Sequence, residues 1–359
     1  MAKVHFVSNS YNGEVLEDLL TYTAQGNDTY DKGLIHIEAG IQMKKTLPHI
    51  QLGKIVQDRK ATPTSNDSQG QYKITERWLE PQDFMIYLEF NPRDYEQYWR
   101  PFQPTGPLVF RELDPRVQAK MLRLLIQGKN EYVGSAIWCG AKGGTAEAKI
   151  TAPAGCQEIG GEHEYGTMKY FDGAIKRIIA NATIDGSTPE KYQALSEAQK
   201  NEVDGGQVKI VGSTELTTGE AVESAFKALW KELPAKLRSN PNLRYITSYD
   251  VWTLYDEYLS TKSSKYTDNT QENKLSFKGK AIVPVVGVPE HTIVLGIFNR
   301  ELNSNLWMGV DYSQDYEAIK VEPLQNNSEL YFFKMNLKMD VNIVKPKEIL
   351  VWTAYKSAE

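Results

Sequence analysis

The sequence predicts an α+β protein, and three observations support this class. Two stretches in which apolar and polar residues alternate come early, between residues 46 and 90. Helical periodicity follows in the middle of the chain, and alternating strands return after residue 276. Strands and helices therefore occur in separate runs rather than in a regular β–α–β alternation, which is the pattern of an α+β fold.

The composition is that of an ordinary folded protein. Its 359 residues are 41 % hydrophobic and 24 % charged, enough for two domains or for one core with long excursions. The formal charge of −5 argues against a dedicated nucleic-acid binder, which needs a basic surface, but allows a protein that only encloses nucleic acid. Cys139 and Cys156 are too few for a disulfide framework and indicate a reducing compartment.

The chain carries no targeting pattern that we recognise. Its first residues contain no apolar signal-peptide core, and no run of about 18 apolar residues occurs anywhere. We therefore expect a soluble protein that is intracellular when made.

The N-terminal part predicts an arm followed by a long hairpin. Residues 1–45 show no sustained period, which favours an arm that lies on another surface. Ile50 and Leu52 alternate with polar neighbours, and Tyr72, Ile74 and Trp78 do the same beyond a polar tip. An isolated two-stranded hairpin is only marginally stable in water. The hairpin must pack on its own domain or on a neighbour, and one sequence does not decide between them.

The middle of the chain predicts several helices. The first begins at Pro115, with Asp114 as a possible cap, and the stretch after it, from 139 to 165, is predicted to be a loop. Shorter helices are expected in "YFDGAIKRIIAN" and "TPEKYQALSEAQKNEV". The clearest helix follows Thr217 and Glu220, which have capping-box spacing. Its buried stripe consists of Val222, Ala225, Phe226, Leu229 and Leu233.

A second helix and a series of strands complete the chain. Ser248 is expected to cap "SYDVWTLYDEYLSTK". Residues 276–296 have the spacing of a strand, a turn at Pro289, Glu290 and His291, and another strand. A later segment alternates cleanly and should place five side chains on one face: Tyr331, Phe333, Met335, Leu337 and Met339. "EILVWTA" is expected to form the last strand.

No motif supports catalysis. "CGAKGGTAEAK" lacks the Gly-Lys-Ser/Thr ending of a phosphate-binding loop, and no dinucleotide-binding glycine pattern follows a strand. Cys139, Cys156 and His163 do not have zinc-ligand spacing, and Glu162 and Glu164 fit a solvated loop. We find no serine nucleophile elbow either. The sequence thus predicts no enzyme, no metal and no cofactor.

From residue 213 to 353 the succession of segments resembles the major capsid proteins of tailed bacteriophages with the Hong Kong 97 fold. The matching features are a capped helix, the strand "RYITS" and a second helix, then "LSFKGKAIVPVVGVPEHTIVLGIFNRELNSNLWMGVD". The final "YFFKMNLKMDVNIVKPKEILVW" resembles the usual end of these proteins. The resemblance covers about the last 40 % of the chain by its segments and the rest by architecture.

This resemblance implies a division of the chain into five parts, in which the helix from Pro115 is a spine helix. They are an N-terminal arm (1–45), an extended β-hairpin loop (46–90), a peripheral domain with the spine helix (91–164), an axial domain (165–310) and return strands of the peripheral domain (311–359).

The resemblance also implies a structural protein that self-assembles into hexamers and pentamers of an icosahedral phage head around double-stranded DNA. Its partners would be further copies of itself, a portal and a separate scaffold or decoration protein, in the virion after synthesis in the bacterial cytoplasm. The hairpin contacts would come from Ile50, Leu52, Lys54, Tyr72, Ile74 and Trp78, and the axial-domain helices would carry Phe226, Leu229, Trp230 and Tyr255.

Three alternatives remain open at this stage. An encapsulin-type shell would also form a closed particle, whereas a tail tube or another virion ring would not. A metal-dependent hydrolase would have to use the 139–165 loop, where the ligand spacing is wrong. Ordinary surface exposure explains Lys54 and Lys60 as well as a covalent crosslink between subunits would, so we predict no crosslink.

Overall fold

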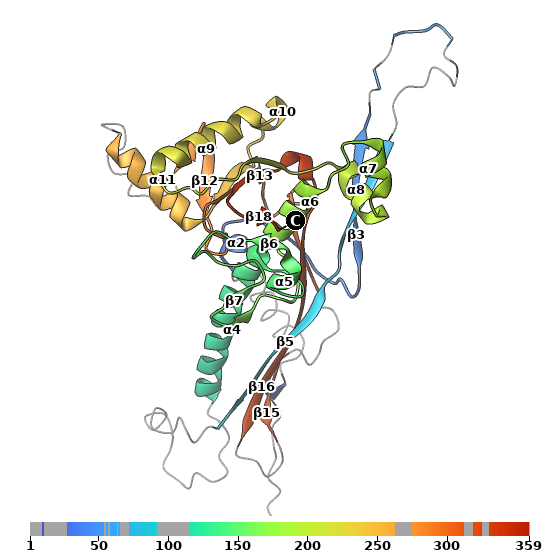
Figure 1. Ribbon diagram of the computed structural model, residues 1–359. Coiled ribbons are helices and arrows are strands. Elements are labelled where there is room, and N and C mark those ends of the chain that lie inside the picture. Colours follow the sequence, from blue (N-terminus) through green and yellow to red (C-terminus); the bar gives the residue numbers. More distant parts are fainter. Residues whose placement is uncertain are drawn as a thin grey trace, which may run out of the picture.

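The computed structural model shows an elongated α+β molecule with a hairpin that projects from its body (Figure 1). It describes residues 9–10, 27–53, 55–56, 58–62, 64, 72–91, 115–262, 275–311, 319–324 and 330–358. The helices are α2 (Asp28–Asp31), α4 (Pro115–Cys139), α5 (Thr145–Ala148), α6 (Ala174–Thr183), α7 (Pro189–Ala194), α8 (Glu197–Gly205), α9 (Gly219–Glu232), α10 (Ala235–Arg238) and α11 (Tyr249–Thr261).

The strands form two six-stranded sheets and three two-stranded ones. They are β1 (Asn9–Ser10), β2 (His36–Glu38), β3 (Lys45–Leu52), β4 (Tyr72–Leu79), β5 (Gln82–Phe90), β6 (Ile150–Thr151), β7 (Glu162–His163), β8 (Gly166–Thr167), β9 (Lys209–Gly212), β10 (Leu243–Thr247), β11 (Ser276–Phe277), β12 (Lys280–Pro284), β13 (Thr292–Ile297), β14 (Leu306–Val310), β15 (Ile319–Pro323), β16 (Tyr331–Ile343), β17 (Leu350–Thr353) and β18 (Lys356–Ser357).

The first large sheet is organised around β16, the longest strand in the described part of the chain. Its order is β1-β15-β16-β14-β2, and β5 also pairs with β16, from Tyr331 opposite Phe90 to Met339 opposite Gln82. The predicted alternation is confirmed, since the side chains at 333, 335, 337 and 339 are buried. Tyr331, at the start of the strand, is half-buried.

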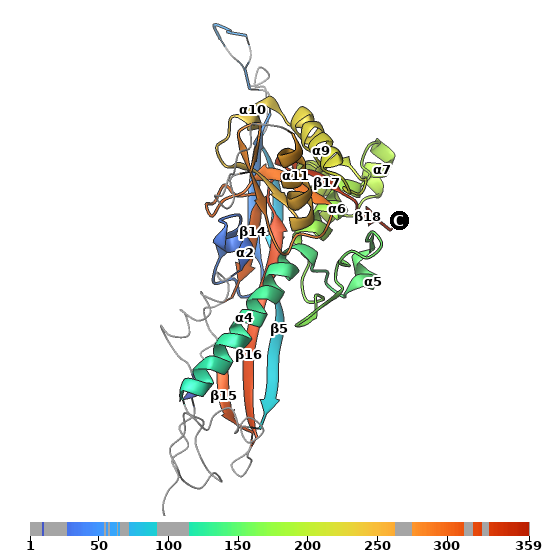
Figure 2. The same ribbon diagram turned by 90° about the vertical axis from the view of Figure 1, so that its left-hand side faces the viewer.

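Helix α4 runs alongside this sheet, as Figure 2 shows. It starts at Pro115, as the sequence predicts, because proline already has the backbone angle of a first helical residue and needs no N–H there. Val133, Ile137 and Trp138 are fully or almost fully buried, and α6 adds Ile175 and Ile178 to the same core. The sheet and these two helices form the larger hydrophobic core of the molecule.

The second large sheet has the order β11-β12-β10-β13-β17-β9. The sequence predicts strands β12 and β13 and the turn between them, where His291 has a φ of 55°. The two strands nevertheless do not pair, because β10 lies between them, parallel to β12 and antiparallel to β13. The last predicted strand, β17, pairs with β13 and β9 and so belongs to this sheet.

Helices α9 and α11 cover the second sheet. The predicted stripe of α9 is confirmed, since all five of its members are buried. The helix begins one residue later than the capping-box spacing indicates, because the Thr218 hydroxyl accepts the Ala221 N–H. Ser248 is the N-cap of α11, but its side chain makes no capping hydrogen bond.

Two segments have more structure than the sequence predicts. The stretch 188–203 contains two helices rather than one, because Ser196 and Gln199 form a capping box that starts α8. The stretch 139–165, predicted to be a loop, contains α5 and short strands. These elements span four residues or fewer, too short to produce a recognisable period.

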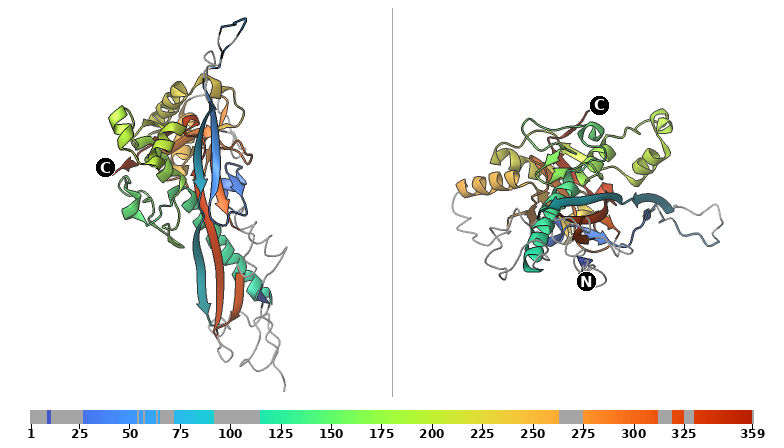
Figure 3. Two further views of the ribbon diagram at one scale, coloured as in Figure 1. Left: turned by 90° about the vertical axis from the view of Figure 1, so that its right-hand side faces the viewer. Right: turned by 90° about the horizontal axis from the view of Figure 1, so that it is seen from below.

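The predicted hairpin is present and consists of β3 and β4. It ends at Leu79, and the next strand, β5, leaves it to pair with β16 in the first sheet. The paired strands of the hairpin therefore occupy 45–79, a shorter range than the predicted 46–90. Figure 3 shows the hairpin extending sideways from the body and the long strands β5 and β16 running away from it.

Candidate interaction surface on the hairpin

The hairpin presents different side chains on its two faces. In the antiparallel ladder, Ile50 lies opposite Ile74 and Leu52 lies opposite Tyr72. Because side chains alternate along a strand, these four residues point to one side, which we call the outer face. The alternate residues of β4, including Thr75 and Arg77, point to the other side, which we call the inner face.

The outer face is apolar and exposed. The exposed fractions are 60 % for Ile50, 52 % for Leu52, 76 % for Tyr72 and 60 % for Ile74. A single exposed apolar residue is normal, but four on directly opposed positions of two strands make a contiguous patch. Beyond the end of the ladder, Ile55 and Val56 are exposed as well. A surface of this kind is suited to contact with another macromolecule.

Trp78 lies at the base of the outer face and is half-buried. The ammonium group of Lys44 lies 3.8 Å from the centroid of its ring, a cation–π geometry. Lys54, the remaining predicted contact residue of the hairpin, lies outside the described residues. The structure thus brings the predicted apolar residues onto one face.

The inner face packs on the same chain. Arg77 is only 6 % exposed, and its guanidinium donates to the Ile343 carbonyl and to the carboxylate of Glu202 on α8. Lys73 forms an ion pair of 2.7 Å with Asp204, also on α8. Burial, together with the nearby Lys345, lowers the pKa of the inner-face His49. The contact with α8 was missed by sequence reasoning, because Lys73, Thr75 and Arg77 are polar residues at alternate positions and are typical of the solvated face of a strand.

Three of the four predicted residues of the helices α9 and α11 lie in the core, and Trp230 packs against its edge. Phe226 and Leu229 are fully buried, and Tyr255 is almost so. The rings of Phe226 and Tyr255 pack edge to face with centroids 5.0 Å apart. Trp230 is half-buried, with the Arg238 guanidinium 5.5 Å from its ring centroid. These four residues hold the helices on the second sheet.

The residues considered for catalysis do not form a reactive centre. Burial raises the pKa of the Cys139 thiol far above its usual range, so the thiol stays protonated and unreactive. His163 and Glu162 lie in the short strand β7, where the Glu162 carboxylate accepts from the Thr167 hydroxyl at 2.8 Å. Among the described residues, no three histidine, cysteine or carboxylate side chains gather as a metal site would require.

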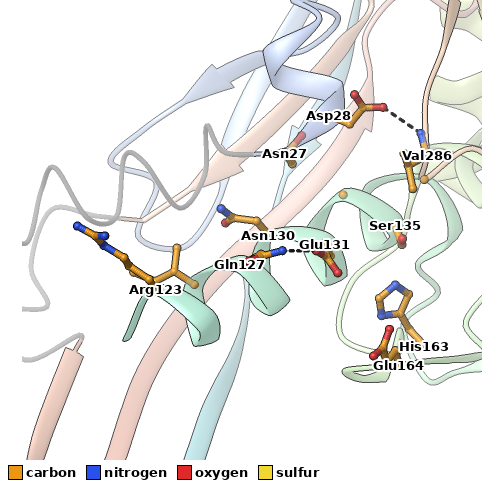
Figure 4. Close-up of a pocket in the computed structure, with 13 residues that line it drawn as sticks. Asn27, Asp28, Arg123, Gln127, Asn130, Glu131, Ser135, His163, Glu164 and Val286 are labelled. Carbon is orange, nitrogen blue, oxygen red and sulfur yellow. Dashed lines mark hydrogen bonds between the residues drawn. The ribbon is translucent and has the colours of Figure 1, made fainter. Parts of the chain in front are cut away.

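A recess of about 910 Å³ lies beside α4, between the start of α2 and the loops at His163 and Val286 (Figure 4). Asp28 accepts the Val286 N–H at 3.0 Å, and Gln127 donates to Glu131 at 3.1 Å. The recess is lined by Asn27, Asp28, Arg123, Ile126, Gln127, Asn130, Glu131, Gly134, Ser135, His163, Glu164, Val286 and Gly287. The recess combines charges of both signs with apolar walls and contains no nucleophile held by a base.

None of the described helices is both long enough and apolar enough to cross a membrane.

Comparison with known proteins gives a result only at the level of structure. No family model matches the sequence, and no curated protein matches it. A chain from the procapsid of satellite phage P4, a particle that includes the size determination protein, superposes with a TM-score of 0.52 at 13 % identity. The match covers 96 % of this chain and 92 % of that chain.

A chain from the capsid asymmetric unit of cyanophage A-1(L) superposes with a TM-score of 0.50, also at 13 % identity. That match covers 98 % of this chain and 96 % of the other. At such low identity the likeness establishes the fold, and it extends over nearly the whole length of both chains.

Proposed function

We propose that this chain, which has the Hong Kong 97 fold of phage capsid proteins, is the major capsid protein of a tailed phage or prophage. It assembles into hexamers and pentamers of an icosahedral head that encloses double-stranded DNA. The observation that carries this proposal is the exposed apolar outer face of the hairpin on a chain of this fold. An isolated subunit leaves this surface in water, and a neighbouring copy would cover it.

The shape of the molecule fits assembly into closed rings. The hairpin projects from one side of the body (Figure 1). If its outer face contacts the body of the next copy, that contact joins two unlike surfaces. A contact between unlike surfaces forms a ring when its rotation closes. Burying the outer face removes apolar area from water at about 25 cal/mol per Å², which favours association. Ile50, Leu52, Tyr72 and Ile74 supply most of that area.

The five-part division is also part of the proposal. The sheet around β16, with α4 as its spine helix, would be the peripheral domain, and the sheet covered by α9 and α11 would be the axial domain. The strand pairing adjusts these boundaries. β5 and β14 both pair with β16, so they would belong to the peripheral domain, whereas β17 would belong to the axial sheet.

The remaining partners follow from the same proposal. A head needs a portal, and a separate scaffold or decoration protein would act on the assembled copies rather than on one subunit. The formal charge of −5 suits a wall that encloses DNA without binding it by sequence. The protein would be made in the bacterial cytoplasm and reside in the virion, where it acts without catalysis.

Electron microscopy of the purified protein, combined with light scattering, tests the proposal. We expect uniform shells, or rings of five and six subunits, from the unmodified chain. In the variant Ile50→Ser/Ile74→Ser, shell yield should fall at least tenfold while the monomer stays folded. The matched control is Val286→Ser, which removes an equally exposed apolar side chain outside the hairpin.

Three results would contradict the proposal. Open tubes would indicate a tail-tube protein instead of a shell, and closed shells loaded with a protein cargo would indicate an encapsulin-type shell. Normal shell yield from the double variant would remove the role assigned to the outer face.

A further inference from the structure

The inner face of the hairpin makes a continuous series of contacts with helix α8. The alternate residues Lys73, Thr75 and Arg77 of β4 all face this helix. The ammonium of Lys73 lies 2.7 Å from Asp204, and Arg77 pairs with Glu202. A Cβ placed on Gly205 would lie 3.4 Å from the Thr75 hydroxyl, so the helix and strand are already in close contact at this point.

The carboxylates of α8 are held in place by residues outside the hairpin. The amide of Asn181, on α6, donates to Glu202 at 2.6 Å, and its carbonyl accepts the Val208 N–H at 2.8 Å. The hydroxyl of Tyr192, on α7, donates to Asp204 at 3.0 Å. Glu202 and Asp204 are therefore held by α6 and α7 as well as by the hairpin.

The burial of Arg77 makes the geometry of the Arg77–Glu202 pair specific. The Arg77 side chain is about 5 % exposed, whereas most ion pairs on a protein surface lie in water and contribute little. A buried guanidinium with a charged acceptor and a backbone carbonyl makes strong, geometrically specific hydrogen bonds. Such a contact fixes the orientation of the strand that carries it.

We infer that α8 is a brace that fixes the angle at which the hairpin leaves the body, with Glu202 and Asp204 as its positioning residues. The inference rests on the proposed function in one respect: a hairpin held at a set angle presents its outer face ready for a neighbour. Preorganisation of this kind lowers the entropy that must be lost on association. The brace belongs to the isolated subunit and exists before any assembly.

Distances between spin labels in the unassembled protein test the brace directly. One label is placed on the hairpin by Asp58→Cys and one on the body by Lys356→Cys, both in a Cys156→Ser background. With α8 unmodified, the distribution of distances between the two labels should be narrow. In Glu202→Gln/Asp204→Asn its width should increase at least twofold. The control Glu197→Gln removes one carboxylate charge from an exposed position of the same helix and should leave the width unchanged.

A charge-exchange variant distinguishes loss of the Lys73–Asp204 ion pair from a general loss of folding. Asp204→Lys alone places two ammonium groups together and should broaden the distribution, whereas Lys73→Asp/Asp204→Lys restores an ion pair and should narrow it again. Both positions are partly exposed, so the fold tolerates either change. Equal widths in all variants, or no recovery in the exchanged pair, would overturn the inference.

Assembly kinetics separate this inference from the proposed function. If the unmodified protein forms shells, the broadened variants should assemble at least tenfold more slowly, and an unchanged rate would contradict preorganisation. Open tubes or cargo-loaded shells would defeat the capsid proposal, while the label distances, measured on the unassembled subunit, would still decide whether α8 braces the hairpin.

Discussion

Asp340, toward the C-terminal end of β16, accepts a hydrogen bond of 2.8 Å from the guanidinium of Arg177 on α6. The Asp340 carboxylate is almost completely buried and also accepts the Glu80 N–H at 2.9 Å, immediately before β5. One carboxylate thus connects a helix, the central strand of the first sheet and the end of the hairpin.

Breaking this pair should strongly destabilise the fold. Asp340→Ala leaves the half-buried Arg177 guanidinium without its partner and the Glu80 N–H without its acceptor, and we expect a loss of about 3 kcal/mol in the free energy of unfolding. Urea denaturation measures it. The control Asp185→Ala breaks an exposed pair with Lys191 and should leave the midpoint unchanged. Equal effects of the two substitutions would refute the importance of burial.

Lys129 should destabilise the isolated chain. Its ammonium nitrogen is buried on α4 without a hydrogen-bond partner, and burial holds the pKa of Lys129 well below its usual range. Lys129→Met removes this unsatisfied group and should raise the free energy of unfolding by about 1–3 kcal/mol. Lys231→Met, at an exposed position of α9, is the control and should have little effect.

The gain from Lys129→Met should also depend on pH, with a sign fixed by linkage. The unfolded chain binds a proton on Lys129 that the folded chain releases, so the stability of the unmodified protein rises with pH. The gap between the two proteins should therefore narrow as the pH approaches about 10.4, the pKa of an unperturbed lysine. A gap that stays constant from neutral pH to pH 10 would contradict a buried, unpaired amine.

The Asp172 carboxylate should stabilise the fold at neutral pH and lose this effect in acid. Burial acts to raise the pKa of Asp172, but the hydrogen bond from Lys176 and the charge of Arg177 outweigh it and lower the pKa. A lowered folded-state pKa contributes stability that is present above about pH 3.9 and lost as the pH falls through the folded value.

The corresponding variant is Asp172→Asn. It should unfold more easily by about 1–2 kcal/mol at pH 7, because hydrogen bonds to a charged acceptor are lost, and the difference should vanish once the pH falls below the folded-state pKa of Asp172. Thermal unfolding at several pH values measures this. The control Asp256→Asn changes an exposed carboxylate on α11. A difference that persists unchanged in acid would exclude the carboxylate charge as its cause.

Gly219 is required by close packing at the start of α9. A Cβ there would lie 2.2 Å from the Cβ of Tyr258 and 2.6 Å from the Leu254 carbonyl oxygen, both on α11. Gly219→Ala should therefore cost about 1–3 kcal/mol by forcing the two helices apart. Gly134→Ala is the matched control, because its nearest neighbour lies at 3.6 Å and alanine favours a helix. Calorimetry should show opposite changes in the melting temperature, and equal ones would refute the packing argument.

Removing the tip of the hairpin should impair assembly without unfolding the subunit. Deletion of 59–70 leaves both strands of the ladder, so circular dichroism and the melting temperature should stay close to those of the unmodified chain. Shell yield measured by light scattering should fall severalfold. Replacing the same stretch with glycine and serine of equal length separates the role of length from that of sequence. Normal shells from the deletion would contradict the role of the tip.

Local patterns in the sequence predicted those features that depend on neighbouring residues. The alternation of the side chains at Phe333 and Met335, the stripe of α9 and the facing of Ile50 and Ile74 each follow from the period of one element. These features include most of the apolar outer face, because alternation in two strands determines which side chains share a side.

Such local patterns could not predict pairings between segments that are distant in the sequence. Nothing near β12 indicates that β10 inserts between it and β13, because the residues of each strand do not specify which distant strand will be its neighbour. The Arg77–Glu202 contact joins residues 125 positions apart, and either side chain alone resembles a solvated charge. Such contacts depend on tertiary structure, which the local period of a strand or helix does not encode.

The single strand β16 connects β5, β15 and β14 along its 13 residues. Tension applied along the strand would load many backbone hydrogen bonds in parallel, as shear, instead of separating them one after another. If internal pressure from a packed genome stretched the subunit along this direction, the strand would carry the tensile load. The long axis of the subunit would then be its mechanically strongest direction, and rupture would begin at contacts between subunits.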